Sequence, residues 1–317
     1  MRVSGSALKS TILSTRHPTG RIGNDEQTRD RGTGLFRLGA PFVHLGVVMI
    51  ALAGQIVAGN CAEPWKFEKA DPGFGLELEG ALRYGPIHGY LQTPSGGAPG
   101  TTSSQRPTFK ELNIDDFLSP EASLDLRWRN HAFYGGASLV HLDGNSTLDS
   151  TLVSQGTTFP AGAAVKSVID LDLYRLGYQY SFSWGTETGR RLTISPGAGV
   201  ALLNFDYSLK AASGGLAAHR SYLVGGPQLG FSAEWTPPGR FSVAGGIFSS
   251  LPEVSNLFIL STQVTWGFRL WGHGERAGKI FLGVGYDWLD YEDNQPVPNH
   301  IKADFGPMLR FGINARF

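Results

Sequence analysis

The sequence is short of charge, of cysteine and, from Gly75 onward, of any apolar run long enough for a membrane-spanning helix. Charged residues make up 17% of the 317 residues, and positive and negative side chains balance at 27 each. This balance gives no sign of a nucleic-acid partner. The single cysteine, Cys61, lies beside an expected cleavage point, so the mature chain is predicted to need no disulfide and no reactive thiolate. No cofactor is expected either.

The longest apolar run lies near the N-terminus. Leu45 to Val57 reads LGVVMIALAGQIV, with Arg37 upstream and small residues behind it. This order is typical of a secretory signal, whereas a membrane anchor, the alternative, needs about 20 apolar residues. We therefore expect an N-terminal extension and signal peptide over residues 1–62, a periplasmic lead-in over 63–74 and a barrel domain over 75–317.

From Gly75 onward, apolar and polar residues alternate with a period of two between turn residues. The last segment shows this most clearly, because Leu309, Phe311, Ile313 and Phe317 share one face. Repeated alternation of this kind predicts an all-β fold, an antiparallel transmembrane β-barrel of about ten strands, with eight or twelve possible.

Alternation alone does not decide which face is inside, and a soluble barrel with an apolar interior is the alternative. Three features favour a barrel in a membrane. The polar face is rich in glycine, serine and single arginines, and lysine is nearly absent from the middle of the predicted strands. Aromatic residues gather toward the ends of the apolar face, as in the girdles of membrane barrels.

Charged residues on the polar face would then point into a narrow lumen. Both signs are present, and buried charges must be paired or they cost several kcal/mol. We expect a network of ion pairs that plugs the lumen, and a narrow selective pore is the alternative. The predicted lumen residues are Glu77, Glu79, Arg83, Asp125, Arg127, Arg175, Glu234, Arg269, Asp287 and Arg310.

Histidines and aspartates near the predicted outer rim are the candidates for catalysis. His88, His141, His219 and His300 lie there, and a His–Asp pair is able to activate water or a serine. No pair has a diagnostic spacing, so we expect no enzyme and no metal site, with an outer-membrane hydrolase or acyltransferase as the alternative. The neighbouring carboxylates are Asp115, Asp116, Asp143, Asp170, Asp172 and Asp290.

Two motifs carry a family resemblance. Thr158–Gly162 reads TFPAG, Asp170–Phe182 reads DLDLYRLGYQYSF, and the opening Leu76–Gly80 reads LELEG. These segments resemble those of poorly characterised, OmpA-like small outer-membrane β-barrel proteins of Gram-negative bacteria. The resemblance implies a small barrel in the bacterial outer membrane and implies no activity. The terminal pattern ending on Phe317 also resembles the signal read by the barrel-assembly machinery.

These observations together predict an integral outer-membrane barrel with a structural or surface-interaction role. A narrow outer-membrane channel or porin is the first alternative. The expected partners of the protein are outer-membrane lipids, lipopolysaccharide and, during insertion, the barrel-assembly machinery. The sequence does not predict the oligomeric state.

Overall fold

The structure is a computed structural model that describes residues 64–68, 73–94, 106–273 and 276–317. All described residues belong to one compact unit within residues 55–317. The predicted signal peptide therefore lies outside the described residues. Within the described ranges, no helix is both long and apolar enough to cross a membrane.

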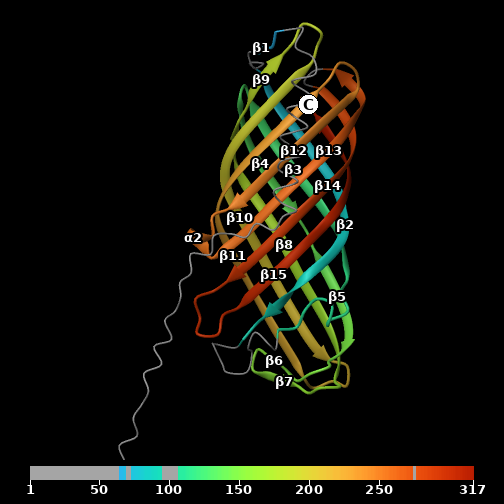
Figure 1. Cartoon of the computed structure of the whole chain (residues 1–317), viewed down its shortest axis with the longest axis vertical. Helices are drawn as coiled ribbons and strands as arrows, with labels where there is room; N and C mark the ends of the chain where they lie inside the picture. Colours follow the sequence, from blue (N-terminus) through green and yellow to red (C-terminus); the bar gives the residue numbers. More distant parts are fainter. Residues whose placement is uncertain (1–63, 69–72, 95–105, 274–275) are drawn as a thin grey trace, which may run out of the picture. The chain divides into compact units, whose positions relative to one another are not determined.

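The barrel has ten antiparallel strands, here called walls, and two of these walls each consist of two consecutive labelled strands (Figure 1). The barrel is closed because β15 pairs with β2 and β8 pairs with β10. The walls are β2 (Phe74–Gln92), β3 (Asp116–Trp128), β4 (His131–Ser138) continued by β5 (His141–Thr147), β8 (Ala164–Tyr180) continued by β9 (Phe182–Gly185), β10 (Arg191–Ala211), β11 (Ala217–Thr236), β12 (Phe241–Ser250), β13 (Leu257–His273), β14 (Arg276–Glu292) and β15 (His300–Arg316). The predicted all-β class, antiparallel closure and count of ten are confirmed.

Four short elements lie around this barrel. The strand β1 (Lys66–Phe67) pairs with β9 at one end, within the segment predicted as a lead-in. At the other end, β6 (Leu152–Ser154) and β7 (Thr157–Phe159) form a hairpin of their own. The single helical turn α2 (Pro252–Ser255) connects β12 to β13. Short turns occupy the end that holds β1, which in bacterial barrels is the periplasmic end.

The glycine- and proline-containing segment of residues 85–120 is typical of a long outer loop, but both of its ends lie in strands. The strand β2 continues to Gln92, and β3 begins at Asp116. The two strands extend this far because Ile87, Leu91 and Phe117 pack inside the barrel. Residues that look like part of a loop therefore belong to the wall.

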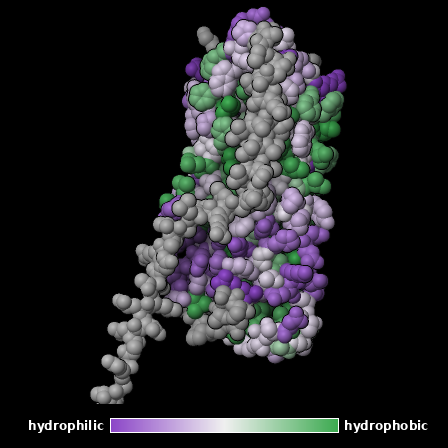
Figure 2. Space-filling model, in the orientation of Figure 1, coloured by the Kyte–Doolittle hydropathy of each residue, from purple (hydrophilic) through white to green (hydrophobic). Residues whose placement is uncertain are grey.

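The barrel has two halves with opposite distributions of apolar side chains. In the half next to the short turns, here called the membrane half, apolar residues such as Leu176 point outward and polar residues point inward. In the other half, here called the outer half, Ile169 and Leu171, which lie in β8 as Leu176 does, are fully buried inside the barrel. Figure 2 shows the change on the face in view, with green side chains around the membrane half and purple ones around the outer half.

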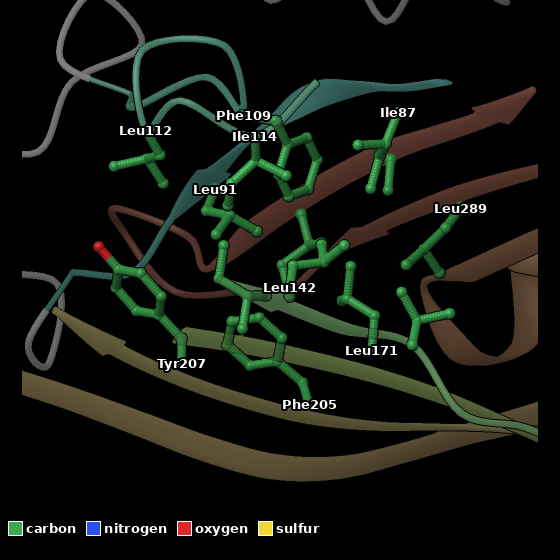
Figure 3. Close-up of a cluster of buried hydrophobic side chains, with 14 of the residues drawn as sticks. Ile87, Leu91, Phe109, Leu112, Ile114, Leu142, Leu171, Phe205, Tyr207 and Leu289 are labelled. Carbon is green, nitrogen blue, oxygen red and sulfur yellow. The ribbon is translucent and has the colours of Figure 1, made fainter. Parts of the chain in front are cut away.

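The outer half encloses a hydrophobic core instead of a channel. Phe205 and Tyr207 of β10 are fully buried there and face Leu91 of β2 and Leu289 of β14 in one cluster (Figure 3). Each fully buried side chain of the size of leucine or phenylalanine stabilises the folded state by about 1.5–3 kcal/mol relative to leaving it exposed to water. The outer half is thus a filled barrel with its own core.

Candidate functional site: a charged chamber in the membrane half

Between the hydrophobic core and the short turns, the inward faces of the strands enclose a polar chamber of about 260 Å³. Six carboxylates and six cations line it, so their formal charges cancel. The carboxylates are Glu77, Glu79, Glu121, Asp125, Glu234 and Asp287, and the cations are Arg83, Arg127, Arg175, Lys279, Arg310 and Arg316. Charge balance matters here because an unpaired ion in a buried site is costly.

Nine of the ten lumen residues predicted from the sequence line this chamber. Arg269 does not, and lies at the end of the barrel with the short turns, where its Nη2 donates to the carbonyl oxygen of Gly239 at 2.6 Å. The prediction omitted Glu121, Lys279 and Arg316. The alternation contained a signal for all three, because residues an even number of positions apart in one strand share a face. Glu121 shares a face with Asp125, Lys279 with Asp287 and Arg316 with Arg310.

Arg83 organises the outer end of the chamber. Its Nη1 donates to Oδ2 of Asp287 at 2.5 Å, and its Nε lies 3.4 Å from Oε2 of Glu121. Its Nη2 also contacts the hydroxyl of Ser138. Arg175 approaches the same Asp287 at 3.9 Å from β8, so side chains from widely separated walls meet at one carboxylate.

Arg310 connects this cluster to the middle of the chamber. Its Nη2 donates to Glu121 at 2.7 Å and to Glu79 at 3.2 Å, and the arginine is almost completely buried. Asn314, on the same strand, donates through Nδ2 to Glu79 at 3.2 Å and to Glu77 at 2.8 Å. These bonds carry the network from the outer toward the periplasmic end.

Arg316 continues the network to the periplasmic end. Its Nε donates to Glu77 and its Nη2 to Glu234, both at 2.9 Å. Lys279 contacts the same Glu234, and Arg127 pairs with Glu77 at 2.7 Å. The contacts from Asp287 to Glu234 therefore form one connected series across the chamber.

Two aromatic side chains also cross the lumen. Tyr134 of β4 lies against Gly177 and Gly199, where an added Cβ atom would collide with its hydroxyl group. Its ring meets Phe248 of β12 edge-on, with 6.0 Å between centroids. Arg175 lies over the Phe248 ring at 5.6 Å. The glycines make room for a ring that narrows the lumen.

The hairpin β6–β7 covers the outer end of the barrel. Gln155 donates through Nε2 to the carbonyl oxygens of Thr93 at 2.9 Å and Pro94 at 3.0 Å. Thr157 donates to the carbonyl of Ala217 at 3.1 Å, and Phe159 is fully buried beneath. The hairpin is therefore bonded to the residues that follow β2 and to β11, and it packs onto the core.

Several histidines form carboxylate contacts, but on the outer surface of the outer half. His141 contacts Asp170 at 2.5 Å and Asp143 at 3.2 Å, and its side chain is 60% exposed. The hydrogen bond with Asp170, followed by the charges of both aspartates, raises the pKa of the His141 imidazole. His219 and His300 make similar contacts with other carboxylates. None of these three histidines lines the chamber described above.

The residues of the predicted assembly signal lie on the lipid-facing surface. Leu309, Phe311, Ile313 and Phe317 are all more than half exposed. The first three alternate with Arg310, Gly312 and Asn314, which face the lumen side. Recognition of these four residues by the barrel-assembly machinery stays a prediction.

The fold and the chamber together define a transmembrane β-barrel of ten strands with a lumen crossed by side chains. No protein-family model and no curated protein matches the sequence. The chain is similar to the outer membrane protease OmpT from Escherichia coli, at 9% identity and a TM-score of 0.41, over 80% of this chain and 98% of the other.

Two further solved structures are similar over most of the chain. A Pseudomonas aeruginosa FadL homologue has 10% identity and a TM-score of 0.28, over 77% of this chain and 90% of the other. The translocator domain of the autotransporter NalP from Neisseria meningitidis has 10% identity and a TM-score of 0.27, over 88% and 98%. One is named a protease, one a homologue of FadL and one a translocator, so no single activity is common to them. The strand pairing of the structure itself shows the barrel, and the OmpA-like assignment stays a prediction.

Proposed function

We propose that the protein is a non-conducting barrel of the Gram-negative outer membrane with a structural or surface-interaction role. The apolar belt of the membrane half supports a lipid environment. The observation that carries the proposal is the connected, charge-balanced network between Asp287 and Glu234, because paired side chains occupy the space that a pore would need.

Two further layers support a closed lumen. The apolar core of the outer half offers no polar path for ions, and burial of an unpaired ion among such side chains is strongly unfavourable. The β6–β7 hairpin lies over that core. The polar exterior of the outer half is then the surface available to partners outside the membrane.

Planar-bilayer recording of the refolded full chain tests the proposal. We expect no stepwise conductance in potassium chloride at applied voltages of either sign. An open porin refolded in the same detergent is the positive control, and the shifted gel migration of unheated barrels verifies folding. Steady, ion-selective steps would contradict the proposal and favour the narrow channel.

We also propose that the chain is not an enzyme. The His–Asp contacts lie on the outer surface of the barrel, away from the chamber. Mass spectrometry of lipid A from cells with and without the protein tests the most direct alternative, a hydrolase or acyltransferase. We expect identical lipid A profiles, and a change in acyl-chain number would contradict this proposal.

A further inference from the structure

The periplasmic end of the barrel contains a second cavity, of about 390 Å³, here called the basic mouth. It is bounded by Phe74 at the start of β2, by Phe317 after β15 and by the short turns. The mouth and the chamber share five lining residues: Arg127, Thr193, Glu234, Lys279 and Arg316. The basic mouth is therefore the approach to the chamber from the side opposite the core.

Charge is unbalanced in the basic mouth, in contrast to the chamber. Among the described residues, seven arginine and lysine side chains line it, and the lining carboxylate side chains are Glu68 and Glu234. Three of the seven, Arg127, Lys279 and Arg316, also line the chamber and pair with Glu77 or Glu234. The cations that line the mouth but not the chamber are Arg129, Arg191, Arg269 and Arg276, and they exceed Glu68 and the α-carboxylate of Phe317 by two. A concave site of one sign with low-dielectric walls concentrates its field and attracts counter-ions.

Three of these cations have no carboxylate partner among the described residues: Arg129, Arg269 and Arg276. Two are held in place by other contacts. Arg129 lies over the Trp128 ring at 5.0 Å, in a tight turn where its φ is 55°. Arg269 is anchored by its bond to Gly239, described above. Cations restrained in this way are prepared for a ligand, since less side-chain freedom is lost when it binds.

We propose that the basic mouth binds a small multivalent anion that carries phosphate or carboxylate groups and arrives from the periplasm. Guanidinium groups suit such anions because their planar donors match the geometry of both groups. The enclosed size favours a small ion over a polymer. The outer half is filled, so the ligand enters and leaves at the periplasmic end. The direction of approach rests on the proposed outer-membrane location, but binding itself does not.

Isothermal titration calorimetry of the refolded full chain in a non-ionic detergent tests the site, with pyrophosphate and citrate as separate probes at constant ionic strength. We expect one anion per barrel. The double variant Arg269→Gln/Arg276→Gln should weaken binding at least about tenfold, because each arginine lost removes charge-assisted hydrogen bonds. Comparison of the two probes shows whether phosphate or carboxylate groups are preferred.

The matched control is Arg190→Gln/Arg240→Gln, which removes two arginines at the same end of the barrel that do not line the mouth. It should leave the affinity within about twofold of the unmodified chain. Absence of binding for both probes, or an equal loss in the two double variants, would overturn the inference. Either result leaves the conductance test of the closed lumen unaffected.

Discussion

Replacement of Arg310 by methionine removes the guanidinium that bridges Glu79 and Glu121 inside the chamber. The arginine side chain is 2% exposed, and its carboxylate partners are 24% and 20% exposed. Methionine retains much of the packing volume but leaves two mostly buried carboxylates with less compensation. Loss of one partner from a buried pair costs about 3–5 kcal/mol, so we expect the free energy of unfolding to fall by that amount.

The double variant Arg310→Met/Glu79→Gln separates charge from packing. It removes one charge of each sign, and Glu121 retains its contact with Arg83 at 3.4 Å. We expect the double variant to recover about 2 kcal/mol relative to the single variant, within the range of coupling energies between contacting charges. The physical reason is that the chamber is neutral again.

Urea unfolding of the refolded barrels in lipid vesicles, followed by tryptophan fluorescence, measures these differences. Lys66→Gln is the control, because the Lys66–Glu187 pair is mostly exposed and should contribute less than about 1 kcal/mol. A double variant as unstable as Arg310→Met would show that packing, not charge, is lost. A loss below 1 kcal/mol for Arg310→Met would refute a desolvated network.

Three further predictions concern the outer half, the surface and the lipid face. Phe205→Ala in the outer core should reduce the free energy of unfolding by about 3–5 kcal/mol in the same urea assay, because the ring is fully buried. His141 has a raised pKa in the folded state, so its contribution to stability is complete below its unfolded pKa and is lost as pH rises through the folded pKa. Asp170→Asn should lower that pKa in an NMR titration of the imidazole and reduce the pH dependence of the urea midpoint; an unchanged pKa would contradict the role of the contact. Phe311→Arg on the lipid face should cost about 2–4 kcal/mol if the site lies near the bilayer midplane, measured by folding into vesicles, and a neutral effect would contradict a lipid-facing position.

The barrel architecture was predictable from the sequence because side chains in a strand alternate between two faces. The same rule grouped nine residues that the structure places around one chamber, from Glu77 in β2 to Arg310 in β15. The face to which a residue points follows from its position along its own strand and needs no knowledge of neighbouring strands.

The outer half was not predictable in the same way. In β8, Ile169 and Leu171 are buried inside whereas Leu176 is exposed, so the apolar residues change parity within one strand. In β15, a register shift places Phe305 inside and Leu309 outside although both numbers are odd. Across such a shift, the alternation of residues does not predict which side chains face inward until the pairing with the neighbouring strand is known.

The sequence by itself thus determined the class of fold, the faces of the membrane-half strands and most of the charged residues between them. Only the tertiary structure decided how these charges pair, because Arg310 and Glu121 are 189 positions apart and meet only when the barrel closes. It also decided that the outer half is filled and that Arg269 belongs to the basic mouth. Both depend on strand length and register, which local alternation does not encode.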